Sequence, residues 1–302
     1  PIQMLVLFAA RGHKNAAVVL EVPADRWKEH EKELNRLAEA LQVGKVWICS
    51  GCANVVTPDM KACPTCKTAV YPSDPDLAEF SRKYETQIVT TSLETYLKCY
   101  VPYGSVKATP AAPKVVEDYS ILLSEEVAKY PETFWRKLDL ESLIICSTVI
   151  SARGEIGAGG GLTLTRHAIL LLPHSEVLDV QKSSRQAVHH ELLHAIDQKD
   201  NGTMEDADWS KLNPWGFEYD SKRAFDTWQF NDYYKGFVSN YCRNNIADDK
   251  AEYFGYMLVF KGRMKARAEK DRNVAKKVAR VKQLATDYCP ALDEKWWAAL
   301  DP

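Results

Sequence analysis

Residues 188–197 are Val-His-His-Glu-Leu-Leu-His-Ala-Ile-Asp, and a helix is expected to contain them. His190 and His194 are four positions apart, so both imidazoles project from one face of a helix and can bind a single Zn²⁺. Glu191 would lie beside the open coordination position and take a proton from metal-activated water as that water attacks a peptide carbonyl. Asp197 is on the same face and could accept the second ring N–H of a ligand histidine.

A third protein ligand is expected from a second acidic helix start, at residues 248–252. Asp248 and Glu252 are four residues apart, so both carboxylates occupy one face, as a ligand and a supporting group would need. Acidic residues also favour the first turn of any helix because of the helix dipole. The acidic pair therefore indicates a metal site only together with the histidine helix.

Residues 115–290 resemble zincin metallopeptidases, specifically bacterial zinc-binding peptidases related to the catalytic domain of anthrax lethal factor. The likeness rests on the order of features: two strands, a glycine stretch (Gly157–Gly161 here), a strand along which substrate lies, the His-Glu-x-x-His helix with its following Asp, and a later acidic helix. The resemblance implies an α+β zincin-like domain that hydrolyses peptide bonds.

The same resemblance assigns further roles. The family has a Tyr seven residues before its acidic ligand, and Tyr241 stands seven before Asp248. This spacing favours Asp248 as the ligand and Glu252 as its supporting neighbour, with Tyr241 donating a hydrogen bond to the oxyanion. The family ligand is usually Glu, so Asp248 is one methylene shorter and Glu252 remains an alternative ligand.

Four cysteines in two pairs, Cys49 and Cys52 followed by Cys63 and Cys66, predict a separate site. Two Cys-x-x-Cys pairs ten residues apart have the spacing of knuckles that hold one structural Zn²⁺, and they resemble a zinc ribbon. A redox pair is the alternative, but no strand-helix-strand pattern lies nearby to favour it. The other four cysteines are isolated, which indicates a reducing compartment and predicts a cytoplasmic protein.

The composition is that of an ordinary globular protein. The chain has 302 residues, 46% of them hydrophobic and 26% charged, with a formal net charge of -2. These values exclude collagen-like and wholly disordered chains. With a net charge so close to zero, the protein as a whole exerts no electrostatic attraction on nucleic acid or anionic lipid. We expect a protein or peptide substrate, with a further protein partner at the ribbon. We expect no membrane, and no nucleic acid because residues 45–67 carry few basic side chains.

The chain is expected to divide into four parts. Two apolar runs and a helix ending near Gly44 predict a small α/β segment over residues 1–45, which the ribbon follows over 46–71. Proline, serine and glycine near both ends of residues 72–113 predict a linker region. The zincin-like domain would then occupy residues 114–302.

Within that last part, apolar runs predict two buried strands and helical spacing predicts most of the remainder. The expected strands are 143–150 and 169–172, and the expected helical segments are 115–129, 183–199, 248–287 and 290–300. We therefore expect a zinc-dependent metallopeptidase with one catalytic and one structural Zn²⁺. The alternative is a non-catalytic, zinc-stabilised binding or regulatory module that acts through its ribbon.

Overall fold

In the computed structural model of the chain, the apolar run predicted as a strand over 143–150 forms β7, Ser142–Ser151, the strand on which the largest sheet is built. The structure describes residues 2–11, 14–23, 47–52, 54–91, 93–94, 97, 106–151, 154–156, 160–165, 168–173, 178–200, 206–220, 230–231 and 233–300. The chain divides into two units, Pro1–Tyr71 and Pro72–Pro302, and β7 belongs to the second.

The sheet of the second unit is mixed, with strand order β5-β7-β10-β9. The first half of β7 pairs in parallel with β5 and β10, and its second half pairs antiparallel with β6 and β8. β9 pairs antiparallel with β10 and is the last strand of that order. The bounds are Gln87–Val89 for β5, Lys107–Pro110 for β6, Gly154–Ile156 for β8, Gly161–Thr165 for β9 and Ala168–Leu171 for β10.

Helices account for most of the rest of this unit, and several begin at side-chain caps that the sequence supplies. Asp74, Asn245, Asp271 and Asp293 each accept a backbone N–H at a helix start, which satisfies donors that the helix itself leaves unpaired. The helices are α2 (Pro75–Tyr84), α4 (Pro113–Ala128), α5 (Glu132–Leu138), α6 (Leu178–Asp200), α7 (Ala207–Ser210), α8 (Ile246–Val259), α9 (Lys261–Lys270), α10 (Arg272–Tyr288), α11 (Glu294–Ala299) and the 3₁₀ helix η2 (Tyr241–Arg243).

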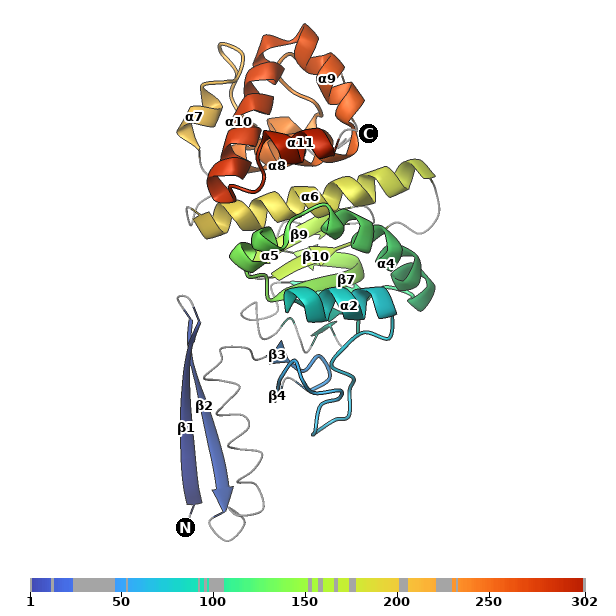
Figure 1. The fold of residues 1–302 in the computed structure, drawn as a ribbon, viewed down its shortest axis with the longest axis vertical. Helices are drawn as coiled ribbons and strands as arrows, with labels where there is room; N and C mark the ends of the chain where they lie inside the picture. Colours follow the sequence, from blue (N-terminus) through green and yellow to red (C-terminus); the bar gives the residue numbers. More distant parts are fainter. Residues whose placement is uncertain are drawn as a thin grey trace. The chain divides into compact units, whose positions relative to one another are not determined.

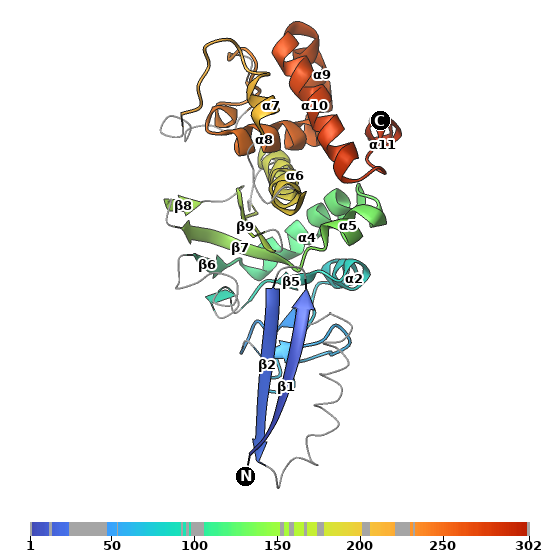
Figure 2. The same cartoon turned by 90° about the vertical axis from the view of Figure 1, so that its left-hand side faces the viewer.

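α6 runs through the middle of the second unit, between the sheet and the C-terminal helices (Figures 1 and 2). Every residue from Gln186 to Asp197 is buried. A helix covered on both sides normally carries apolar residues all round. The histidines and carboxylates that α6 buries therefore need partners inside the protein, and these partners form the candidate site.

The first unit contains two small antiparallel sheets. β1, Ile2–Arg11, pairs with β2, Lys14–Pro23, and β3, Trp47–Ile48, pairs with β4, Val55–Val56. The two apolar runs expected in residues 1–45 thus form strands. The helix expected to end near Gly44 lies outside the described residues.

The expected linker over residues 72–113 instead carries α2, β5 and β6 of the second unit. The Pro-Ser-Asp composition after Tyr71 belongs to the start of α2, where Asp74 caps the helix and Pro75 occupies its first turn. Leu77 and Ile88 are buried in the main core. Turn-forming residues here mark a helix boundary rather than a flexible connection.

The expected α+β class is confirmed, since a mixed sheet and helices share one core of buried residues. The expected strands at 143–150 and 169–172 correspond to β7 and β10, and the histidine helix corresponds to α6. Among the described residues, no helix is both long and apolar enough to span a membrane.

Candidate metal centre

The two histidines of α6 point at each other. His190 Nε2 and His194 Nε2 are 3.0 Å apart, and the ring planes are inclined at 84°. One helical turn separates the two residues, so the helix alone brings the nitrogens together. Both residues are buried, and two imidazole nitrogens this close need a proton or a cation between them.

Asp248, in the first turn of α8, supplies an oxygen to the same point. Its Oδ1 lies 3.4 Å from His194 Nε2 and 3.9 Å from His190 Nε2. The other oxygen, Oδ2, accepts hydrogen bonds from the side-chain amides of Asn244 and Asn245, which turns Oδ1 toward the histidines. Asn245 also caps α8 by accepting from the Asp248 N–H at 2.8 Å.

The spacing of these three atoms fits a zinc ion. Tetrahedral Zn²⁺ with bonds of about 2.0–2.1 Å to nitrogen and oxygen places neighbouring ligand atoms roughly 3.3 Å apart. His190, His194 and Asp248 offer atoms separated by 3.0, 3.4 and 3.9 Å. The donor set is two imidazoles and one carboxylate, which is the type found in catalytic zinc sites with a fourth position for water.

Glu252, one turn further along α8, faces the other side of His190. Its Oε1 lies 3.1 Å from His190 Nδ1 and accepts a hydrogen bond from Gln186 Nε2 at 2.6 Å, while Oε2 accepts from Ser239 Oγ at 2.6 Å. Both carboxylate oxygens of Glu252 are therefore occupied by partners other than the Nε2 atoms of His190 and His194. This arrangement orients the His190 ring so that Nε2 faces Asp248.

The carboxylates around His190 change its protonation. Burial alone would lower the pKa of His190, but the hydrogen bond to Glu252 and the charges of Glu191, Glu252 and Asp248 outweigh burial and raise it to about 9. Burial acts in the opposite direction on Asp248, whose pKa is nevertheless lowered by its contacts with His194 and His190. The three carboxylates thus place negative charge around the two imidazoles.

Glu191 is held against β9. Thr163 Oγ1 donates to Glu191 Oε2 at 2.7 Å and lies 3.0 Å from the Glu191 main-chain oxygen. The carboxylate belongs to the same cluster as the two histidines, since one ligand atom from each of the three residues lies within 4.8 Å of the others. Glu191 can therefore reach a molecule bound between the histidines.

Tyr241 lies in η2, ahead of α8, and its ring is beside His190. The two ring centroids are 5.9 Å apart, with planes inclined at 46°. The phenol ring of Tyr241 therefore lies next to one of the two candidate histidine ligands. Its role as oxyanion donor stays a prediction.

Asp197 has a different neighbour from the one expected. Its Oδ2 lies 2.6 Å from Nζ of Lys250, and both side chains are almost fully buried. His194 Nδ1 has no hydrogen-bond partner among the described residues. Burial raises the pKa of Asp197, and the charges of Lys250 and His194 offset this only in part. The structure therefore does not show the expected bond from Asp197 to a ligand ring, since His190 Nδ1 faces Glu252 instead.

Several residues of the centre were not identified in the sequence. Thr163, Gln186, Ser239, Asn244 and Lys250 each hold a site residue, yet none belongs to a motif. Only Asn245 left a local signal, because an Asn three residues before an Asp is a common helix start. Asn244 is also local, since it stands four residues before Asp248, and Ser239 stands thirteen before Glu252. Thr163, Gln186 and Lys250 contact segments that are far apart from them in sequence.

The neighbouring histidine of α6, His189, faces away from the centre. Its Nδ1 accepts from Tyr130 OH at 2.7 Å, and its Nε2 donates to Glu126 Oε2 at 2.7 Å. Glu126 also pairs with Lys129 and Arg185. This network fastens α6 to α4.

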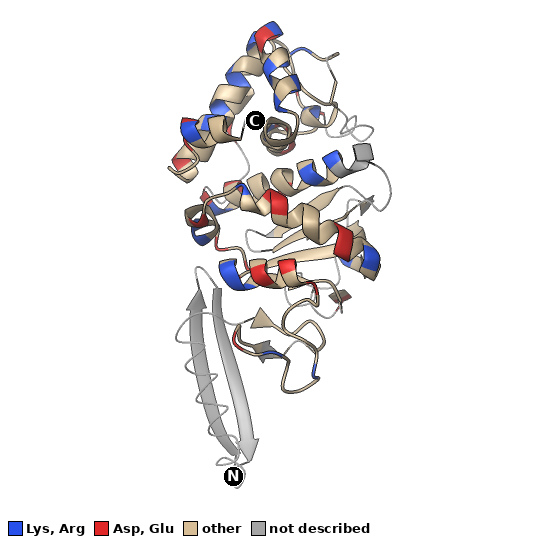
Figure 3. Cartoon of the chain, turned by 45° about the vertical axis from the view of Figure 1, so that its right-hand side comes forward, with Lys and Arg blue, Asp and Glu red and all other residues tan. Residues whose placement is uncertain are grey.

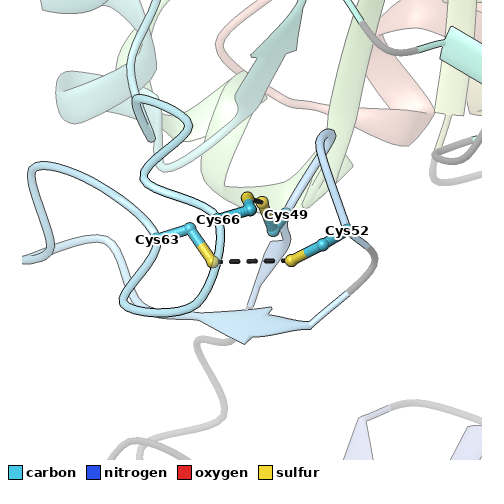
Figure 4. A group of neighbouring side chains, drawn as sticks. All are labelled: Cys49, Cys52, Cys63 and Cys66. Atoms are coloured by element: carbon cyan, nitrogen blue, oxygen red, sulfur yellow. Dashed lines mark hydrogen bonds between the residues drawn. The ribbon is translucent and has the colours of Figure 1, made fainter.

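The four paired cysteines converge in the first unit (Figure 4). Cys49 Sγ lies 3.5 Å from Cys66 Sγ, and Cys52 Sγ lies 3.6 Å from Cys63 Sγ, much too far for disulfides. All four sulfur atoms lie within 4.8 Å of one another and could hold a metal ion. With Zn–S bonds of about 2.3 Å, sulfur atoms of a tetrahedral site would be roughly 3.8 Å apart, so the cluster fits Zn²⁺.

A match to a family model agrees with this chemistry. Residues 158–293 match the family model described as "Putative zinc-binding metallo-peptidase", a range that contains α6 and α8. A crystal structure titled a putative zinc-binding metallo-peptidase, from Bacteroides caccae, has 18% sequence identity and a TM-score of 0.42, covering 77% of this chain and 94% of that chain. No curated protein matches this chain. The relation to anthrax lethal factor stays a prediction.

Proposed function

We propose that the second unit is a zinc-dependent metallopeptidase with His190, His194 and Asp248 as metal ligands. The observation that carries the proposal is the convergence of two imidazole nitrogens and one carboxylate oxygen within 3.0–3.9 Å of one another. Two helices distant in sequence supply these atoms. The family match over residues 158–293 supports the zinc-binding part of the proposal.

The residues around the ion divide the chemistry between them. Bound Zn²⁺ would lower the pKa of a water molecule and polarise the peptide carbonyl. Glu191 would accept a proton from that water and donate it to the leaving amine. Tyr241 donates its phenolic proton in a hydrogen bond to the developing oxyanion. Glu252 keeps the His190 ring in place.

The strand β9 provides a place for the substrate backbone. It is the last strand in the order β5-β7-β10-β9. Leu172 N donates to Gly160 O, and the bonds of an antiparallel pair alternate, so the main-chain groups of Gly161 and Thr163 face away from β10. An extended peptide that pairs with this edge passes directly beside Glu191.

The mechanism is tested by the Glu191→Gln variant. Zinc-loaded wild type should cleave members of a broad peptide library, and a chelator should abolish the cleavage. Glu191→Gln should retain zinc and lose at least about 100-fold in kcat, because the amide cannot accept the proton. Cleavage by the variant at the wild-type rate would defeat the mechanism.

The choice of acidic ligand is tested by metal content. Asp248→Ala should lose the metal of this centre, whereas Glu252→Ala should bind it about 10- to 100-fold more weakly, as loss of a supporting group does. Loss of metal in Glu252→Ala alone would reverse the assignment. The four-cysteine site serves as an internal reference in both variants.

A second candidate function is a binding or regulatory module that acts through a zinc ribbon. Its supporting observations are the separate cysteine cluster and the Asp at the ligand position where the family usually has Glu. Zinc at the histidine centre would then stabilise a scaffold. A zinc-loaded protein that cleaves nothing in a broad library would favour this function, and chelator-sensitive cleavage would exclude it. In either case we expect two Zn²⁺ per chain.

A further inference from the structure

Thr163 is the one described residue whose side chain donates to the carboxylate of Glu191. The bond joins β9 to α6 across 28 positions of sequence, and the same hydroxyl lies 3.0 Å from the main-chain oxygen of Glu191. We propose that Thr163 is the positioning residue of Glu191: its hydroxyl occupies Oε2 and leaves Oε1 for the reacting water. This inference rests on the proposed function, because it assigns a task to a base that the proposed function requires.

The fit between β9 and Glu191 is close enough to exclude a side chain at Gly161. A Cβ at that position would come within 2.9 Å of both the carboxyl carbon and Oε1 of Glu191. Gly161 is not among the glycines with positive φ, so backbone conformation does not explain the glycine here. The glycine provides clearance, because β9 approaches Glu191 so closely that a side chain at this position would collide with the carboxylate.

This restraint has a chemical consequence. A glutamate side chain has three rotatable bonds, and a catalytic group must be held within about 0.5 Å of its working position. The hydroxyl of Thr163 contacts both ends of the same residue, its carboxylate and its main chain. The carboxylate is therefore fixed relative to the helix that also carries His190 and His194. A substrate peptide would pair with the same strand. β9 would therefore position both Glu191 and the peptide bond to be cleaved.

A purely structural tie between β9 and α6 makes a different prediction from a positioning role. If Thr163 only stabilised the fold, its loss would lower the free energy of unfolding and leave the turnover of the folded enzyme unchanged. If Thr163 positions the base, its loss lowers kcat while KM and zinc content stay the same. The two roles are separable with Thr163→Val, which keeps the shape of the side chain, and Thr163→Ser, which keeps the hydroxyl.

The experiment compares wild type, Thr163→Val, Thr163→Ser and Glu191→Gln, all zinc-loaded. The first readout is kcat and KM on a fluorogenic peptide taken from the library hits. The second readout needs no substrate: calorimetric binding of acetohydroxamate, a zinc ligand whose proton passes to the neighbouring carboxylate on binding. Zinc per chain and the thermal midpoint are measured for each variant.

We expect Thr163→Val to lose about 10- to 100-fold in kcat, with KM and zinc content unchanged, because one hydrogen bond to a charged group is removed. Its Kd for acetohydroxamate should rise by a similar factor. Thr163→Ser should stay within about threefold of wild type in both readouts. Equal kcat and Kd in Thr163→Val and wild type would overturn the proposal, as would a serine variant as impaired as the valine variant.

Failure of the proposed function has a different signature. Glu191→Gln would then match wild type on the peptide, or neither protein would cleave it, and acetohydroxamate binding alone would decide whether Thr163 acts on Glu191.

A second test uses Gly161→Ala, which should lower kcat at constant zinc content. Its control is Gly262→Ala in α9, where a Cβ meets nothing within 4 Å and no change in kcat is expected.

Discussion

At the scale of single residues, the buried pair of Asp197 and Lys250 is expected to contribute strongly to stability. Lys250 Nζ lies 2.6 Å from Asp197 Oδ2, with both side chains at most 5% exposed. Removing one partner of such a pair leaves a buried charge without compensation. The pair also joins α6 to α8, the two helices that bring the candidate ligands together.

We expect Lys250→Met to lower the free energy of unfolding by about 3–5 kcal/mol, as measured by urea denaturation followed by circular dichroism. The double variant Lys250→Met with Asp197→Leu should recover much of this loss, since it removes both charges. The control is Lys282→Met, whose partner Glu294 is exposed, so the pair should contribute less than about 1 kcal/mol. Equal losses in the two lysine variants would contradict this account.

At the scale of elements, α6 is fixed to α4 by the network around Glu126. Burial alone would raise the pKa of Glu126, but the hydrogen bond from His189 and the pairing with Lys129 outweigh it and lower the pKa to about 2. A group with a lowered folded-state pKa stabilises the fold above its ordinary pKa of 4.5. That contribution is lost as the pH falls from about 4.5 through about 2.

The pKa shift corresponds to about 3 kcal/mol of stability at neutral pH. We therefore expect Glu126→Gln to be less stable than wild type at pH 7, with the difference shrinking as the pH falls toward 2. The measurement is the free energy of unfolding of the metal-free proteins between pH 2 and 7, with Glu132→Gln on the exposed face of α5 as control. A difference that stays constant over this range would count against the assigned pKa.

At the scale of the whole molecule, we expect the folding of the two units to depend on metal to different degrees. Among the residues whose burial is described, the buried cluster around the four cysteines consists of Trp47, Cys49, Val56, Met60, Cys63 and Val70. The second unit has a far larger core, which joins the sheet to α4, α6 and α8. Small folds with so few buried residues generally need a metal to fold, whereas large cores do not.

We expect removal of metal to unfold residues 47–71 and to leave the second unit folded. Hydrogen exchange followed by mass spectrometry should show loss of protection around Cys49–Cys66 after chelation, with β7 and α8 still protected. The charged residues of the second unit lie mainly on its helices (Figure 3). Because this unit should stay folded, we expect these residues to keep their positions. Cooperative loss of protection in both units would show that the histidine centre, too, is needed for folding.

Much of the fold and of the candidate site could be predicted from sequence, because the signals are local. One helical turn brings His190 and His194 together, and two knuckles bring the cysteine pairs together. The linker prediction differed from the structure because turn residues around Asp74 and Pro75 also begin helices. Composition alone does not distinguish these two uses.

The sequence by itself determined which residues can bind a metal, since the periodicity of a helix and the spacing of the cysteines depend only on neighbours along the chain. Tertiary structure alone decided which oxygen faces the histidines. Asp248 turns toward their Nε2 atoms while Glu252 is engaged by Gln186 and Ser239. It also decided that Thr163 reaches Glu191. Such contacts join segments far apart in the chain, and their geometry follows from how the core packs β9, α6 and α8 together.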